Sequence, residues 1–196
     1  MEKLNTFISS AVPLPIENVD TDQIIPARFL KATTRAGFGE NLFRDWRFTK
    51  DGTTKKDFIL NNSIYTGKIL IAGKNFGCGS SREHAAWAIH DYGFKAVVSS
   101  YFADIFKGNA LNNGLLPITV SPVILDQIFQ AIEKDSNTLF EINIPEQTFK
   151  LLASNVTTGF EISPYKKHCL MHGLDDIDFL LSKSDIIEKF ELAHKA

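Results

Sequence analysis

The sequence predicts an α/β domain with a parallel sheet at its centre, because apolar segments of strand length alternate with segments of helical periodicity. The expected strands are three short apolar segments: 68–72, 95–99 and 115–120. The expected helices carry apolar residues at helical spacing: 83–91, 102–113 and 123–133. Successive parallel strands need a crossover connection, which is usually helical and right-handed. The centre of the chain is therefore expected to be a parallel βαβαβ unit.

Before residue 68, short β candidates are separated by long loops, one of which is 32–39. After the parallel centre, the alternating segments 139–144 and 148–152 are typical of an antiparallel pair of strands. These patterns predict β hairpins that flank the parallel sheet.

The C-terminal part of the chain predicts helices. Ser163 and Pro164 are typical of a helix start, and Gly173 of its end. Residues 184–194 form a second amphipathic pattern. We expect a single domain over 1–196, with this helical tail starting at about residue 163.

The composition excludes several classes of protein. With 196 residues, 44% hydrophobic and 22% charged, the chain is neither disordered nor fibrous. The net charge of −2 argues against nucleic acid or an anionic membrane as a partner. No apolar segment approaches the ~20 residues of a membrane span, and the first residues lack the apolar region of a signal peptide. We expect a cytoplasmic location and no membrane.

The cysteines and histidines do not predict a metal site within the chain. Cys78 and Cys169 lie far apart, in no pattern that binds zinc or an iron–sulfur cluster. Free thiols in a reducing compartment are favoured over a disulfide between them. His168 and His172 share a helix face but have no evident third ligand, so surface or interface histidines are the favoured interpretation.

The segment 73–84 carries the most chemical information. It connects an expected strand to an expected helix, where ligands bind in open α/β sheets. Its glycines, Gly79 among them, allow a sharp bend that presents backbone N–H groups beside a helix N-terminus. Those amides and a bidentate Arg82 could bind a carboxylate. Ser80 could act as a base if the same donors stabilise its alkoxide.

A plainer interpretation of this segment remains open. Ser80 and Glu83 also match the S-x-x-E pattern of a helix capping box, which needs no further function. Packed glycines, two serines and an arginine favour a site over a cap alone. A phosphate loop, a complete dinucleotide fingerprint and a nucleophile elbow are all absent. Cys78 has no evident base nearby, which favours a partly buried thiol over a nucleophile.

A second polar cluster lies at 18–26. Asp20 and Asp22 would face the same way if the segment is extended, although an Asx turn before a strand is the plainer interpretation. Four arginines follow in and around a long loop, which is either a functional loop over a pocket or solvated surface: Arg28, Arg35, Arg44 and Arg47.

Several of these motifs together resemble a known family. The segments that carry the resemblance are 18–26, 43–48, 75–84, 102–106, 112–117 and 168–175. They closely resemble the small subunits of bacterial 3-isopropylmalate dehydratase, which are similar to the swivelling fourth domain of aconitase. The resemblance covers nearly the whole chain and implies the same swivelling-domain fold.

The resemblance also implies roles for particular residues. Ser80 would abstract the proton, Ser81 would help through its amide, and Arg82 would bind a substrate carboxylate. Asp22 matches an active-site aspartate of the superfamily, and Arg35 stands at the distance of a second substrate arginine. The loop 32–43 would recognise the isopropyl group.

In that family, a larger partner subunit holds a [4Fe–4S] cluster through three cysteines, and the small subunit closes over it. The implied reaction is dehydration of 2-isopropylmalate and rehydration to 3-isopropylmalate, with this chain inactive alone. A related substrate, such as homoaconitate or a methylated malate, and a non-catalytic anion-binding module remain as alternatives.

Overall fold

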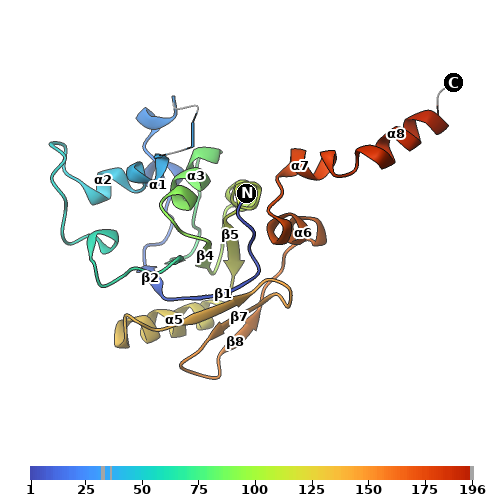
Figure 1. Cartoon of the computed structure of the whole chain (residues 1–196). Coiled ribbons are helices and arrows are strands. Elements are labelled where there is room, and N and C mark those ends of the chain that lie inside the picture. The colour runs from blue at the N-terminus through green and yellow to red at the C-terminus, as the bar shows by residue number, and fades with distance from the viewer. Residues whose placement is uncertain (32–33, 36, 195–196) are drawn as a thin grey trace.

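The described part of the chain folds into one parallel and one antiparallel sheet (Figure 1). The computed structural model describes residues 1–31, 34–35 and 37–194. In the parallel sheet the order is β2 (Ala11–Leu14), β3 (Ile69–Ala72), β4 (Ala96–Ser99) and β5 (Leu116–Thr119). In the antiparallel sheet it is β1 (Thr6–Ser9), β6 (Phe140–Asn143), β7 (Thr148–Leu151) and β8 (Thr157–Gly159). The expected combination of a parallel centre with flanking antiparallel strands is confirmed.

The parallel sheet is covered on both faces, so β3 and β4 are buried along their whole length. Alternate side chains enter two separate hydrophobic clusters. Leu70 and Val97 pack on the side of α3 and α4, whereas Ile71 and Val98 pack on the side of α5 and the antiparallel sheet. Figure 1 shows α3 on one side of the sheet and α5 on the other. The period of two along each strand therefore divides the core into two halves.

The helices of the parallel centre follow their strands as the periodicity predicts. They are α3 (Glu83–Asp91), α4 (Asp104–Asn112) and α5 (Pro122–Lys134). The Ser121 hydroxyl caps α5 by accepting a hydrogen bond from the amide of Ile124 at 3.3 Å, and Pro122 occupies the first helical turn. All three helices begin within two residues of the predicted positions.

The antiparallel sheet contains the predicted hairpin, in which Phe140 and Phe149 stack with ring centroids 5.4 Å apart. Two strands extend it: β1 pairs with β6, and β8 pairs with β7. The sequence analysis did not assign β8, because its three residues are polar or small and show no apolar alternation.

The region before residue 68 has fewer strands than expected. Beyond β1 and β2 it forms short helical turns: α1 (Thr21–Ile24), η1 (Ala27–Phe29), η2 (Phe38–Asn41), α2 (Arg44–Arg47) and η3 (Ile59–Asn61). The extended alternative for Asp20 and Asp22 is therefore wrong, and the favoured turn at this place leads into a helix rather than a strand. Asp20 instead caps α1, with its carboxylate accepting from the amide of Gln23 at 2.7 Å.

The chain ends in three helices, α6 (Pro164–His172), α7 (Asp176–Leu181) and α8 (Ser184–Ala193). Ser163 caps α6 and Gly173 ends it at φ +71°, as predicted. In Figure 1, α7 and α8 extend away from the two sheets. No helix among the described residues is long and apolar enough to cross a membrane.

A substitution at Gly77 tests how closely the turn after β3 packs on α4. Gly77 has φ +75°, and a Cβ there would lie 2.2 Å from Cγ of Phe106. We expect Gly77→Ala to lower the free energy of unfolding by about 3 kcal/mol, from backbone strain and overpacking together. Gly52→Ala is the matched control, because Gly52 has φ +87° but open space around it. Its expected cost is only about 1 kcal/mol. Urea unfolding measures both, and equal costs would contradict the packing argument.

Candidate active site

The glycine-rich turn connects β3 to α3 at the carboxyl edge of the parallel sheet. Buried β3 ends at Ala72, and α3 begins at Glu83. Gly77 and Gly79 both adopt the left-handed conformation that favours glycine. The turn therefore lies where the sequence places a ligand-binding segment.

Residues 19–21 hold this turn in place through four hydrogen bonds, which we call the brace. The amides of Gly77 and Cys78 both donate to the carbonyl of Val19, at 2.8 and 3.2 Å. The amide of Thr21 donates to the carbonyl of Cys78 at 3.0 Å, and the buried Thr21 hydroxyl donates to the carbonyl of Ser80 at 2.9 Å. The brace fixes the backbone on both sides of Gly79.

Both serines of the turn are exposed, as a residue that meets a substrate requires. The first helical residue of α3 is Glu83 and its N-cap is Arg82, which makes no side-chain capping bond. The capping-box interpretation of Ser80 is therefore wrong, since Ser80 lies two residues before the cap. The hydroxyl stays at the surface, beside the positive end of the α3 dipole.

Arg82 and Asp22 form an ion pair between the turn and α1. The Arg82 side chain is 15% exposed, whereas that of Asp22 is 55% exposed. The hydrogen bond from Arg82 lowers the pKa of Asp22 below its usual value. The structure thus brings two predicted site residues into contact, and a carboxylate already occupies one side of the guanidinium.

Arg35 approaches the same end of α3. Its Nη2 lies 3.8 Å from Oε1 of Glu83, and its guanidinium lies over the ring of Trp87 at 5.0 Å. The Arg35 side chain is more than half exposed. In the loop 32–43, Ala32, Thr33 and Ala36 lie outside the described residues, and Phe38 is buried against Trp87.

Two residues support this site in a way that the sequence does not predict: Asn113, and Glu83, which was considered only as part of a capping box. Oε1 of Glu83 accepts a hydrogen bond from Nδ2 of Asn113 at 3.0 Å, and Asn113 is buried at the end of α4. The pair connects the segment 112–117, which had no assigned role, to the first residue of α3. The only signal in the sequence for a role of Glu83 in the site is its position next to Arg82.

Cys78 does not have the environment of a nucleophile. Its thiol is half-buried and donates to the carbonyl of Asn18 at 3.4 Å. Burial raises its pKa, with a contribution from the carboxylate of Asp20. Both cysteines are free, as expected, and Cys169 is buried in α6.

The remaining candidates lie outside the turn. Arg28 pairs with Asp45, and the guanidinium groups of Arg44 and Arg47 both lie over the ring of Phe48. His168 and His172 stack on α6 with ring centroids 4.1 Å apart. Within the described residues, no three His, Cys, Asp or Glu side chains come together as metal ligands. This donor set does not fit an iron–sulfur cluster, which needs several thiolates.

Comparisons with known proteins agree on one family. A family model described as the aconitase C-terminal domain matches residues 1–123. A protein of Christiangramia forsetii named 3-isopropylmalate dehydratase small subunit is 64% identical, over 97% of this chain and 93% of that protein. A protein of the same name from Cytophaga hutchinsonii is 57% identical, over 100% of this chain and 97% of that protein. The crystal structure of 3-isopropylmalate dehydratase from Methanocaldococcus jannaschii superposes with a TM-score of 0.67 at 26% identity, covering 94% of this chain and 98% of that chain.

The ion pair between Arg82 and Asp22 makes a prediction about pH. The pKa of Asp22 is lowered in the folded chain. The ion pair is therefore fully formed at a pH above the usual pKa of aspartate, and it is lost as the pH falls through the lowered pKa. In an NMR titration of the isolated chain, Arg82→Gln should return the Asp22 midpoint to its usual range. Asp45 is the control, because its pKa is lowered by Arg28 and should not move. An unmoved Asp22 midpoint would show that Arg82 is not its partner in solution.

Proposed function

The chain belongs to the family of 3-isopropylmalate dehydratase small subunits, and on that premise we propose that its glycine-rich turn supplies the base for the reaction. The family is part of the aconitase superfamily of hydro-lyases and acts in leucine biosynthesis. The reaction removes water from 2-isopropylmalate and adds it back to give 3-isopropylmalate. The observation that carries the proposal is that a single turn exposes the serine Ser80 beside the carboxylate-binding side chain Arg82. The shared name of relatives at 57–64% identity favours this substrate over homoaconitate or a methylated malate.

Ser80 is the proposed base that removes the proton from carbon. A serine hydroxyl acts as a base only where its alkoxide is strongly stabilised. The amides of the turn, at Gly79 and Ser81, and the N-terminus of α3 are the donors available for this. Closure of a partner over this exposed turn would exclude water and strengthen those interactions.

Arg82 is the proposed binding group for one substrate carboxylate. A guanidinium binds a carboxylate through two parallel hydrogen bonds, and Asp22 already makes such a charged contact at Nη1. A substrate carboxylate would share this guanidinium through its remaining N–H groups, while Asp22 keeps it oriented at Nη1. Asp22 thereby becomes an active-site residue without contacting the reacting carbon.

Arg35 is the proposed binding group for the second carboxylate. Its contact with Glu83 is long, at 3.8 Å, and its side chain is largely exposed, so it keeps donors for a ligand. Recognition of the isopropyl group by the loop 32–43 stays a prediction, since part of that loop lies outside the described residues.

We assign the remaining chemistry to a large subunit. Departure of the hydroxyl needs a Lewis acid, and this chain has no donor set for one among its described residues. The [4Fe–4S] cluster is therefore proposed to belong to the partner, in a heterodimer whose active site forms between the subunits. Two free thiols fit a reducing, cytoplasmic location, which is part of the same proposal.

Replacement of Ser80 tests the assignment of the base. In a complex reconstituted anaerobically with the large subunit, we expect Ser80→Ala to lower turnover by about a thousandfold. The free energy of unfolding should change by less than about 0.5 kcal/mol, because Ser80 is exposed and caps no helix. Absorbance of the unsaturated intermediate formed from 2-isopropylmalate measures the rate.

Ser81→Ala is the matched control, because Ser81 is equally exposed and its proposed contribution is its backbone amide. It should retain most of the turnover. Substantial activity in Ser80→Ala, or equal losses in the two variants, would contradict the assignment.

A further inference from the structure

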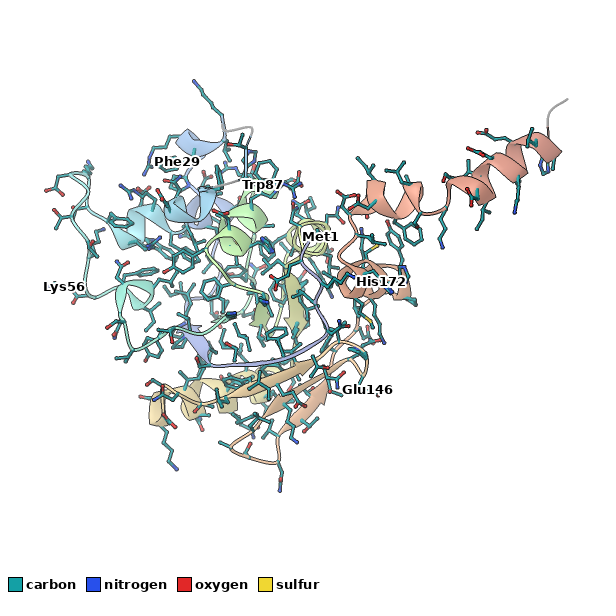
Figure 2. The ribbon with its side chains drawn as sticks, in the orientation of Figure 1. Met1, Phe29, Lys56, Trp87, Glu146 and His172 are labelled. Carbon is teal, nitrogen blue, oxygen red and sulfur yellow. The ribbon has the colours of Figure 1, made fainter. Side chains whose placement is uncertain are left out.

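The two last helices expose many large apolar side chains. We call residues 175–194 the C-terminal arm. We call the rest of the chain, with its two sheets, the body. Figure 2 shows the side chains of the arm projecting beyond the two sheets, with no part of the body beside α8. Seven large apolar residues of the arm are each at least 42% exposed: Ile177, Leu180, Leu181, Ile186, Ile187, Phe190 and Leu192. A concentration of this kind marks an interaction surface.

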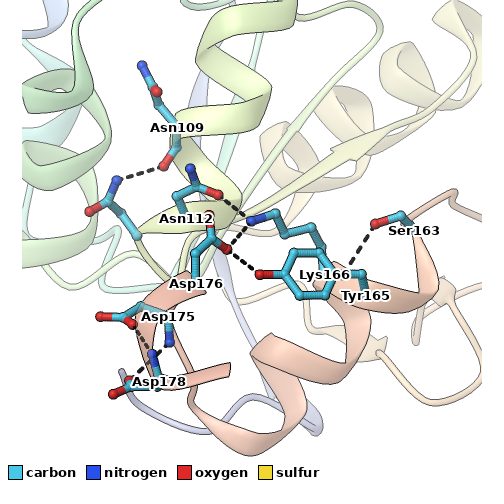
Figure 3. Close-up of polar contacts among 9 residues, drawn as sticks. Asn109, Asn112, Ser163, Tyr165, Lys166, Asp175, Asp176 and Asp178 are labelled. Atoms are coloured by element: carbon cyan, nitrogen blue, oxygen red, sulfur yellow. Dashed lines mark hydrogen bonds and ion pairs between the residues drawn. The ribbon is translucent and has the colours of Figure 1, made fainter. Parts of the chain in front are cut away.

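The first helix of the arm is held firmly against the body (Figure 3). Oδ1 of Asp176 accepts hydrogen bonds from Nζ of Lys166 at 2.5 Å and from the Tyr165 hydroxyl at 2.7 Å. Asp175 and Asp178 form a reciprocal capping box at the start of α7. The ring of Phe179 packs edge-on against Tyr165, with centroids 4.7 Å apart. The direction in which α7 leaves the body is therefore set by the folded chain.

This anchoring determines which face of α7 meets solvent. Successive residues of a helix are about 100° apart, so Phe179 lies opposite Ile177 and Leu181. Since Phe179 faces α6, the latter two side chains point away from the body. In α8, Ile186 and Phe190 share one face by their i, i+4 spacing.

The first residues of the arm lie next to the candidate active site. Nζ of Lys166 also donates to Oδ1 of Asn112 at 2.6 Å, and the next residue, Asn113, bonds to Glu83. A cavity of about 300 Å³ is lined by Arg35 and Asn113 together with Asp175, the first residue of the arm. A partner that covers the turn and Arg35 would therefore reach the arm without a gap.

We propose that the C-terminal arm is a docking element that lays its apolar face into a groove of the large subunit, next to the active site. This inference rests on the proposed function, which requires such a subunit. Between 175 and 194 the chain has six acidic residues and two lysines, so the groove should have a basic rim. Pairing of this arm with the arm of a second copy of the chain is disfavoured, because it would bring two net acidic surfaces together.

The test measures the affinity of the full-length chain for the purified large subunit by anaerobic titration calorimetry. The double variant Ile186→Gln with Phe190→Gln removes the apolar face of α8 but keeps good helix formers. We expect its dissociation constant to rise about tenfold or more. Leu192→Gln is the matched control, since Leu192 is 67% exposed on the opposite face of α8. Its dissociation constant should stay within about twofold of the parent.

Two further measurements keep the outcomes distinct. Turnover of the double variant at saturating large subunit should equal that of the parent, because the active-site turn is untouched. Amide hydrogen exchange of the parent arm should slow when the large subunit is added. Unchanged affinity of the double variant, or unchanged exchange in the arm, overturns the docking role alone. Failure of the parent chain to bind the large subunit overturns the proposed function as well.

Discussion

Four hydrogen bonds between the segment 19–21 and the glycine-rich turn determine the geometry of the candidate site. Without them, a turn with two left-handed glycines would have many conformations available. The brace engages Gly77, Cys78 and Ser80 in succession, and it does so mainly through backbone groups. The Ser80 carbonyl is bound by the Thr21 hydroxyl, and Ser80 itself is exposed. The same segment continues into α1, which brings Asp22 to Arg82.

The brace in turn depends on the parallel sheet. Its two segments follow β2 and β3, which are neighbours in register, so both segments leave the sheet at the same edge. The absence of a side chain at Gly77 lets the turn lie against Phe106 of α4. The result is a surface that carries a serine and two arginines, and none of its described residues belongs to a group of three metal-ligating side chains. Under the proposed function, this surface is one half of the dehydratase site, and the acidic, apolar arm beside it is the proposed contact with the subunit that holds the other half.

The sequence predicted those parts of the fold that local patterns determine. The strands and helices of the parallel centre have strong periodicity, and the turn at 73–84 is recognisable from its residues alone. The contact between Arg82 and Asp22 joins residues sixty positions apart, and no local pattern indicates it. The same holds for Glu83 with Asn113. At Asp20 the favoured turn was expected to precede a strand, but a capping box with Gln23 starts a helical turn there.

The most direct test of the account removes one bond of the brace and leaves every catalytic side chain in place. Thr21→Val keeps the shape of a buried side chain but deletes the hydroxyl that holds the Ser80 carbonyl. In the reconstituted complex, kcat should fall about tenfold or more, because Ser80 is misplaced. The KM should change little, because Arg82 remains bound to Asp22. A kcat equal to that of the parent would contradict the claim that the brace positions the base.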